Sequence, residues 1–367
     1  MRLLAALLLF VASALAGCVA ISNPPESTTV ASPVHVQAVV STPSQDSNGN
    51  IYVKPGDRQT KVEIRIDGAL KTTIAAPGGA ADAINVDRSY PLPAGVHTLV
   101  IKGYEVDGDT SESTRHYTVG SPGAISHVVW VFFENHGYNQ VRSTGEFKRL
   151  ADTYGEATNF FAHTHPSQPN YIYATAGDQC GITSNNLSTC SAENVFHQVG
   201  DSQWRSYQES MPRNCDRVTT GPSPVKHDPA RTFTNIDCAT NDVPLPANPT
   251  FSRKFYFVTP NMCNSAHDCP IETASDFLAS FAPKVLSSPE YRAGNLLFVV
   301  TLDEDEFTEG NHIYTALVNE AARGKRSGTH YDFCNLLGTT EDLLRVGRTG
   351  CAVGAASMAS DFGLRPG

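Results

Sequence analysis

The chain has 367 residues, of which 40% are hydrophobic and 17% charged, a composition typical of folded domains rather than of disordered chains. Its length predicts two domains. The formal net charge is −10 and no basic run occurs, which argues against binding to nucleic acid. The acidic balance does not exclude a small anionic substrate, because a metal ion or a histidine cluster inverts the local field.

The first residues have the pattern of an export signal. Arg2 precedes an apolar stretch that is too short to span a membrane as a mature helix. The sequence LAGC at residues 15–18 resembles a bacterial lipobox. That resemblance implies removal of residues 1–17, lipidation of Cys18 and attachment to a membrane of the bacterial cell envelope, periplasmic or at the cell surface. The alternative is an ordinary secretory signal, and in both cases we expect an exported protein.

The cysteines are unevenly distributed along the chain. Of nine cysteines, Cys18 stands alone, and the other eight lie between residues 180 and 351. An even number in an exported chain predicts disulfides, and here they would all lie in a second domain. Short spacing favours Cys180–Cys190 and Cys263–Cys269, although sequence alone cannot choose the pairing. Zinc binding is the alternative, but the chain has no CxxC pair.

A change of pattern separates two parts after the leader. Residues 18–32 are rich in Pro, Ser and Thr and predict a tether. Residues 33–120 show period-two alternation in VHVQAVV, KVEIRIDGAL and AGVHTLVIKGYEVDGD, with turns at Asp67-Gly68 and Asp107-Gly108. This pattern predicts an antiparallel β-sandwich. The run YPLPAGVHTLVIKGYEVDG resembles a late hairpin of bacterial immunoglobulin-like domains, which implies an immunoglobulin-like spacer or substrate-binding accessory.

Residues 121–367 have a different pattern. Apolar strands (HVVWVFF, KFYFVTP and NLLFVVTLD) alternate with helical stretches such as ETASDFLASFAPKVL and TTEDLLRVG. Such alternation predicts an α/β domain with a mainly parallel sheet flanked by helices. In sheets of this kind, ligands bind beyond the carboxyl ends of the strands.

Those carboxyl ends carry metal-ligating residue types. The candidates are Glu134 and Asn135 after the first strand, Asn261, His267 and Asp268 after the second, and Asp303 and Glu304 after the third. Carboxylate and amide oxygens suit a hard divalent cation such as Mg, Ca, Mn or Fe. A solvated acidic loop is the alternative for Asp303 and Glu304, but the agreement of three strand ends favours a metal site.

The stretch HTHPSQPNYIYATAG supplies a candidate nucleophile. Ser167 stands where a helix can begin, and a hydroxyl at a helix N-terminus beside a cation lies in a positive field that favours its alkoxide. The alternative is a serine that only caps the helix.

Six motifs together resemble a known family. FENHGY, HPSQPNYI, VKHDP, TPNMCNSAHD, TLDEDE and HYDF followed by TTEDLL resemble, in order and approximate spacing, the bacterial phosphoesterase family that includes secreted acid phosphatases and phospholipases C. The resemblance covers roughly residues 125–364 and implies an alkaline-phosphatase-like α/β fold.

Matched motif by motif, the resemblance implies a role for each site residue. It implies that Glu134, Asn135, Asp303 and Glu304 bind the metal. Ser167 falls at the position of the hydroxyl that attacks phosphorus.

The remaining matches concern the substrate. Asn170 follows Ser167 in the same motif and is expected to bind substrate. His227 and His267 match histidines that contact the phosphoryl oxygens or protonate the leaving group. Asp268 and His330 match more peripheral substrate-binding positions.

The sequence therefore predicts an exported, metal-dependent acid phosphatase acting on small-molecule or lipid phosphate monoesters, phosphoinositides among them, through a phosphoserine. Protonated histidines would favour activity below pH 7. The catalytic domain is shorter than those of the phospholipase C members, and Leu302 stands where an aromatic residue is expected. The alternatives are a phospholipase C-type phosphodiesterase and a non-catalytic surface adhesin.

Overall fold

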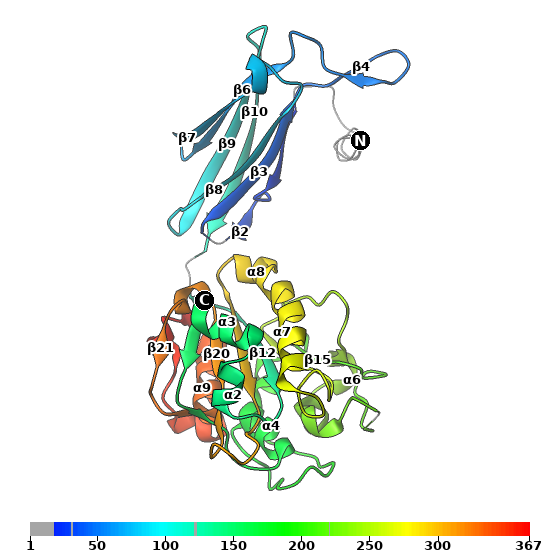
Figure 1. The fold of residues 1–367 in the computed structure, drawn as a ribbon, viewed down its shortest axis with the longest axis vertical. Helices are drawn as coiled ribbons and strands as arrows, with labels where there is room; N and C mark the ends of the chain where they lie inside the picture. Colours follow the sequence, from blue (N-terminus) through cyan, green and yellow to red (C-terminus); the bar gives the residue numbers. More distant parts are fainter. Residues whose placement is uncertain (1–17, 31, 121–122, 220) are drawn as a thin grey trace. The chain divides into compact units, whose positions relative to one another are not determined.

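The structure, a computed structural model, describes residues 18–30, 32–120, 123–219 and 221–367. The predicted signal peptide, 1–17, lies outside the described residues. The chain divides into two compact units with a boundary between residues 121 and 122, one residue from the predicted boundary. Figure 1 shows an all-β first unit and a mixed second unit.

The first unit is a β-sandwich. One sheet has the order β1-β3-β8 and the other the order β2-β10-β9-β6-β7. The strands are β1 (Cys18–Asn23), β2 (Thr28–Val30), β3 (Val34–Ser41), β6 (Gln59–Ile66), β7 (Ala69–Ala75), β8 (Ile84–Tyr90), β9 (Gly95–Glu105) and β10 (Thr110–Val119). Alternate residues such as Val36, Ile64 and Ile101 form its core. The predicted sandwich is confirmed, and the immunoglobulin-like assignment stays a prediction.

The predicted tether is wrong. Residues 18–23 form β1, which pairs antiparallel with β3 from Cys18 opposite Ser41, and residues 28–30 form β2, which pairs parallel with β10. Val19 and Ile21 are buried in the core of the sandwich. These two apolar residues already alternate in CVAISN, and this strand pattern outweighs the Pro, Ser and Thr content around it.

The second unit is built on an eight-stranded sheet of order β16-β15-β17-β12-β18-β20-β13-β21. Its strands are β12 (His127–Phe133), β13 (Gly155–Ala157), β15 (Trp204–Gln208), β16 (Asp242–Pro244), β17 (Phe255–Thr259), β18 (Leu296–Leu302), β20 (Thr315–Val318) and β21 (Arg326–Ser327). Only β20 runs antiparallel to its neighbours β18 and β13. The prediction of a mainly parallel sheet is confirmed.

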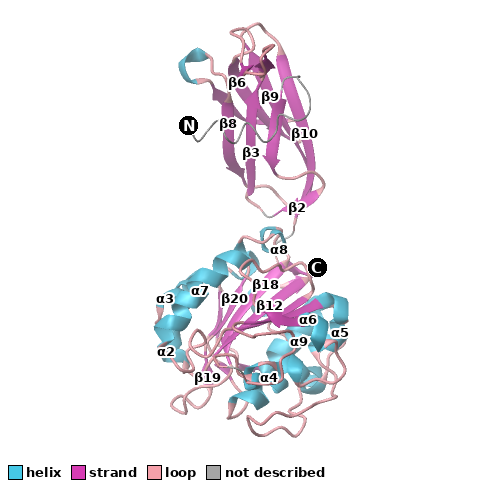
Figure 2. Ribbon diagram, turned by 90° about the vertical axis from the view of Figure 1, so that its right-hand side faces the viewer, coloured by secondary structure: helices cyan, strands magenta, loops and turns pink. Residues whose placement is uncertain are grey.

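Helices cover both faces of this sheet. Figure 2 shows α3 (Gly145–Thr153) and α7 (Ile271–Leu286) on one side and α5 (Val195–Val199) and α9 (Phe333–Leu344) on the other. Residues 128–133 of β12 are fully buried, as expected for a central parallel strand covered on both faces. The helix α4 (Ser167–Ala176) packs against α9.

Four disulfides stabilise the second unit. Cys180–Cys190 and Cys263–Cys269 are confirmed, and the other two are Cys215–Cys238 and Cys334–Cys351. Such a set fits an exported protein. Within the part of the chain that the structure describes, no helix combines the length and apolar character that crossing a bilayer requires.

Pairing between the central strands determines where the site lies. Phe133 of β12 lies opposite Leu302 of β18, so the next residues, Glu134 and Asp303, leave the sheet at the same level. The N–H of Asp303 donates to the Phe133 carbonyl at 3.1 Å. The carboxyl ends of the two strands are therefore joined where their acidic residues begin.

Candidate active site

Three carboxyl groups are buried together beyond β12 and β18. Glu134 and Asp303 have no exposed surface, and Glu304 is 5% exposed. Burial raises the pKa of Glu134 to about 8, with the charge of Glu304 adding to the effect. Burial, followed by the charges of Glu134 and Glu304, raises the pKa of Asp303 well above its usual range. The expected metal-binding carboxylates therefore form one buried cluster, and the solvated-loop alternative is wrong.

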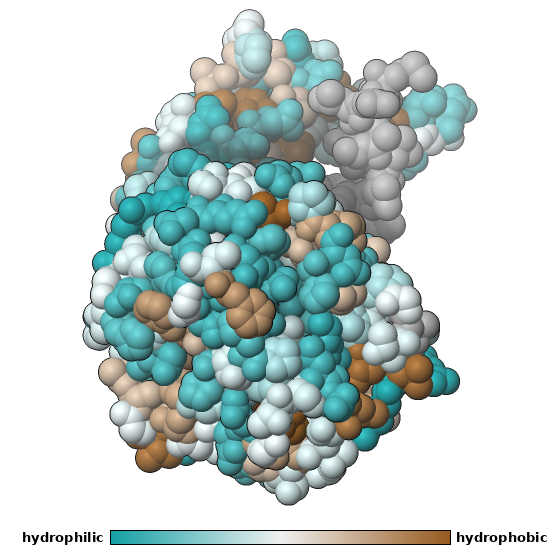
Figure 3. All heavy atoms as spheres, turned by 60° about the horizontal axis from the view of Figure 1, so that its bottom comes forward, coloured by the Kyte–Doolittle hydropathy of each residue, from teal (hydrophilic) through white to brown (hydrophobic). Residues whose placement is uncertain are grey.

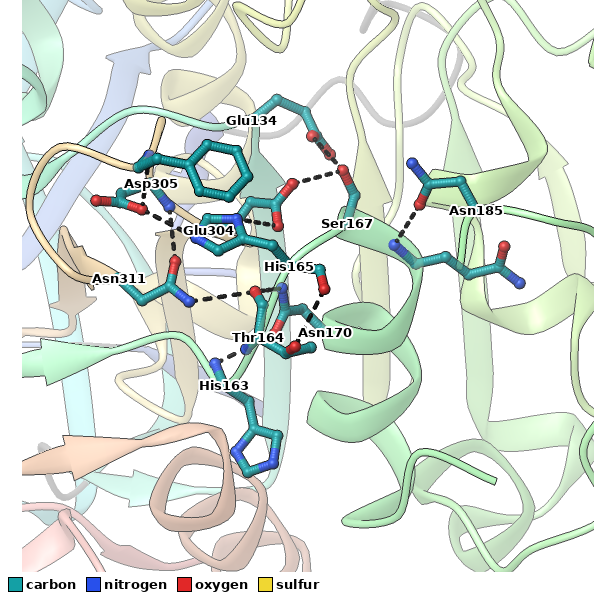
Figure 4. A network of polar contacts seen from close by, with 12 residues as sticks. Glu134, His163, Thr164, His165, Ser167, Asn170, Asn185, Glu304, Asp305 and Asn311 are labelled. Carbon is teal, nitrogen blue, oxygen red and sulfur yellow. Dashed lines mark hydrogen bonds and ion pairs between the residues drawn. The ribbon is translucent and has the colours of Figure 1, made fainter. Parts of the chain in front are cut away.

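Ser167 points into this cluster. It is the first residue of α4, and its hydroxyl lies 3.0 Å from Glu304 Oε1 and 3.3 Å from Glu134 Oε2 (Figure 4). The N-cap position belongs to Pro166, and no side chain caps this helix end. One turn later, the Tyr171 hydroxyl donates to Glu134 Oε1. The interpretation of Ser167 as a helix cap is therefore excluded.

Asn170 shapes the turn that precedes Ser167. Its Oδ1 accepts from the backbone N–H groups of His163 (3.1 Å) and Thr164 (3.0 Å), and its Nδ2 donates to the Thr164 carbonyl at 2.7 Å. Asn311 donates to the same carbonyl at 3.2 Å. Figure 4 shows both amides around this turn. Asn170, predicted to bind substrate, is fully buried and positions the backbone instead.

His227 lies beside Glu134. Its Nε2 is 3.1 Å from Glu134 Oε1, and neither ring nitrogen has a hydrogen-bond partner among the described residues. Burial, followed by the charges of Lys226 and His267, lowers the pKa of His227 well below its usual range. The direction of this pKa shift runs against the expected protonation of His227, because desolvation disfavours the charged ring. A neutral imidazole is the form that binds metals.

His267 belongs to a short polar chain. Its Nε2 lies 2.9 Å from Lys226 Nζ, and its Nδ1 lies 2.8 Å from Asp268 Oδ1. An ammonium group can only donate, so Nε2 accepts and the Nδ1–H donates to Asp268. Asp268, predicted to bind substrate, therefore orients the ring, and Lys226 brings a cation to the site.

Sequence reasoning missed three residues here. His165 places Nδ1 2.8 Å from Glu304 Oε2 and Nε2 3.2 Å from Asp305 Oδ1. Lys226 and Tyr171 are the others. All three stand inside the matched motifs, and Tyr171 follows Ser167 by four residues on one helix, a spacing that puts both on one face.

Other predicted residues lie differently. Asn135 is half-buried next to Glu134. His330 is exposed and stacks on Phe161 with ring centres 4.9 Å apart, so its described contacts do not reach the carboxylates. The side-chain oxygen of Asn261 accepts from the N–H groups of Cys263 and Asn264, which assigns it to the loop.

The buried side chains fit a divalent cation. Ligand atoms of Glu134, His227 and His267 lie within 4.8 Å of one another, and both oxygens of Asp303 lack a hydrogen-bond partner within the described chain. Buried charges persist when they are paired or bound to metal. Carboxylate oxygens suit Mg, Ca or Mn, and an added imidazole nitrogen suits Fe. Glu134 touches both the acidic group and the histidine group.

Comparisons with known proteins identify the family of the chain. The profile of the phosphoesterase family matches residues 136–340, more than half of the chain. A phosphate-repressible acid phosphatase of Penicillium chrysogenum is 28% identical over 65% of this chain, which spans 64% of that protein. A phosphatidylinositol-3-phosphatase of Mycobacterium tuberculosis is 28% identical over 65% of this chain and 83% of its own length.

A crystal structure of an alkaline phosphatase superfamily protein from Vibrio parahaemolyticus aligns with 66% of this chain and 72% of its own, at 12% identity and a TM-score of 0.47. The match of the family profile over residues 136–340 establishes the relationship. The chain belongs to the phosphoesterase family.

Proposed function

We propose that this protein is an exported, metal-dependent acid phosphatase that hydrolyses phosphate monoesters through a phosphoserine at Ser167. One observation carries the proposal: the Ser167 hydroxyl points from a helix N-terminus at two buried carboxylates, Glu304 at 3.0 Å and Glu134 at 3.3 Å. A serine with only a structural role would not require two buried carboxylates beside its hydroxyl. The named activities of the acid phosphatase and phosphatidylinositol-3-phosphatase relatives support the same chemistry.

The reaction has two displacement steps. In the first, Ser167 Oγ attacks phosphorus, its proton passes to the Glu304 carboxylate, and the bond to the leaving alcohol breaks. Lys226, hydrogen-bonded to His267, is placed to supply a proton to the leaving oxygen. In the second, water attacks the phosphorus of the phosphoserine and the bond to Ser167 Oγ breaks. Oγ takes back the proton held by Glu304, and a proton of the water passes to Lys226 as phosphate leaves. General acid–base groups of this kind contribute about 10²–10⁴-fold to rate.

The metal would be held by Glu134, Asn135, Asp303 and Glu304, with His227 as a further candidate. When bound, a hard divalent cation supplies charge stabilisation to the phosphoryl oxygens. His227 contributes as a neutral ligand, since burial lowers its pKa. In this proposal, activity at acidic pH does not require a protonated His227.

The substrates are monoesters of small molecules or lipids, phosphoinositides among them. A phosphodiesterase of the phospholipase C type would hydrolyse the diester bis-p-nitrophenyl phosphate faster than the monoester p-nitrophenyl phosphate. For this protein we expect faster hydrolysis of the monoester. The lipobox supports the further proposal of a lipoprotein held in the cell envelope through Cys18.

Ser167→Ala tests the nucleophile, and Ser288→Ala is its matched control. Ser288 is a true N-cap that accepts from the Tyr291 N–H at 3.2 Å. We expect Ser167→Ala to lower kcat by roughly three orders of magnitude or more because the covalent route is lost. Ser288→Ala should keep its kcat and lose about 0.5–2 kcal/mol of stability.

Acid-quenched wild-type enzyme should carry labelled phosphate on Ser167, located by peptide mapping, and the Ser167→Ala variant should carry none. A Ser167→Ala variant with wild-type kcat would mean that water attacks phosphorus directly.

A further inference from the structure

A cavity of about 500 Å³ adjoins the proposed site. Lys226 and Asp268 line it, and both contact His267. Asn185 lines it as well, and its Oδ1 accepts from the N–H of Gln168, the residue after Ser167, at 3.0 Å (Figure 4). The cavity wall therefore includes residues that contact His267 and the residue after Ser167. The size of the cavity falls within the range of small-molecule sites.

The charges on the cavity wall are mainly positive. Arg217 and Lys226 both line it, and its one carboxylate, Asp268, is already paired with His267. Arg217 is exposed and makes no hydrogen bond or ion pair to any described residue. Arg213, four residues earlier, instead pairs with Asp216 at 3.1 Å. The cavity thus offers a guanidinium fork that is free to bind an anion, a geometry that suits phosphate.

Part of the cavity wall is apolar and exposed. Leu187 and Val218 line it and are 53% and 60% exposed. Figure 3, which brings the lower side of Figure 1 forward, shows a mostly hydrophilic surface on the second unit with scattered hydrophobic side chains. The same cavity thus combines apolar and cationic side chains.

We infer that this cavity binds the leaving group of the substrate, and that this group carries a second phosphoryl group recognised by Arg217. The inference rests on the proposed function and narrows its substrate class. The preferred substrate is a phosphate monoester of a polyol that bears another phosphate, free or as the diester of a lipid headgroup. Lys226 faces the reacting end of that molecule, and Arg217 the distal phosphate.

Kinetics with two soluble substrates test the inference in the full chain. Myo-inositol 1,3-bisphosphate and myo-inositol 3-phosphate differ by one phosphate. For wild type we expect a higher kcat/KM with the bisphosphate. Arg217→Gln should lower that kcat/KM by about three- to fivefold, the size expected for an exposed charge pair, and leave the monophosphate unchanged. Arg213→Gln, an exposed arginine of the same loop, should change neither.

A second arm separates the subsite from catalysis. Calorimetric titration of Ser167→Ala should show tighter binding of the bisphosphate than of the monophosphate, and adding Arg217→Gln should remove the difference. Equal binding of the two ligands before Arg217 is changed would overturn the inference. A binding preference without any hydrolysis by wild type would uphold the subsite and overturn the proposed function alone.

A third substrate, dibutanoyl phosphatidylinositol 3-phosphate, distinguishes a free phosphate from a headgroup diester as the group that Arg217 binds. Arg217→Gln should lower its kcat/KM as for the soluble bisphosphate when a headgroup diester is recognised. A loss confined to the soluble bisphosphate would identify a free phosphate as the ligand. Equal loss with both bisphosphorylated substrates and the monophosphate would overturn the inference, because Arg217 would then act on catalysis in general.

Discussion

Asp303 places a carboxyl group at the centre of the second unit with neither oxygen hydrogen-bonded to a described residue. Asp305, two residues later, is equally buried, but it accepts from the backbone N–H groups of Phe307 and Glu309. The pKa shifts of the two carboxyls have opposite signs, raised for Asp303 by burial and lowered for Asp305 by the backbone donors that outweigh its burial. Similar residues in one acidic run thus have opposite electrostatic roles.

This contrast predicts opposite effects of amide substitution in protein stripped of metal. Asp303→Asn removes a carboxyl group whose burial favours the protonated form, so it should raise the free energy of unfolding near pH 7. It should also abolish the upward shift in Tm on adding Mn²⁺. Asp305→Asn loses a charge that the backbone stabilises and should lower the free energy of unfolding. Thermal melts with and without cation measure both, and destabilisation by Asp303→Asn would contradict the repulsive cluster.

The helix α9 shows the same principle at the scale of an element. Its N-terminus is closed by Asp332, which accepts from the N–H groups of Cys334 and Asn335 in a capping box. On its buried face lies Glu341, which accepts from the Thr349 N–H at 2.9 Å. Burial raises the pKa of Glu341 to about 7. Asp332 thus stabilises the start of the helix, whereas the burial of Glu341 costs free energy.

Glu341 therefore contributes a pH-dependent stability of definite sign. The folded state binds its proton more tightly than the unfolded chain, so stability is full below the ordinary pKa of about 4.3 and is lost as pH rises toward about 7. Glu341→Gln should flatten this part of the stability curve and raise stability at pH 7.5 relative to wild type by roughly 2–3 kcal/mol. Urea unfolding across pH 4–8 measures it. Glu272→Gln, an exposed carboxyl on α7, should leave the slope unchanged.

At the scale of the whole molecule, features that depend on local sequence patterns could be predicted, whereas contacts between distant segments could not. The strands β12, β17 and β18 followed from continuous apolar runs, and their acidic ends followed from topology. The hydrogen bonds that link Lys226, His267 and Asp268 join two segments of the sequence, since Lys226 and His267 are 41 residues apart. No local sequence pattern predicts such a contact. Composition also misled, since residues 18–23 and 28–30 pair through their backbone in spite of the tether-like composition around them.

The lipobox carries a prediction for the whole protein. Cys18→Ser should move the expressed protein from the membrane fraction to the soluble fraction while its phosphatase activity stays unchanged, because lipidation requires the thiol. Because β1 begins at Cys18, the substitution is made at the edge of the sandwich, and a circular dichroism spectrum identical to wild type controls for folding. Unchanged partitioning would show that the protein is not held by a lipid on Cys18.

The pairing of Phe133 with Leu302 also makes the geometry of the site depend on the register between β12 and β18. A slip of one residue between β12 and β18 would displace Glu134 from Asp303 by about 3.3 Å and turn one of them to the other face. A hydrophobic core of Val and Leu tolerates such an error far better than a set of ligands does. Cation binding during refolding would thus select correctly aligned chains from compact, misaligned ones.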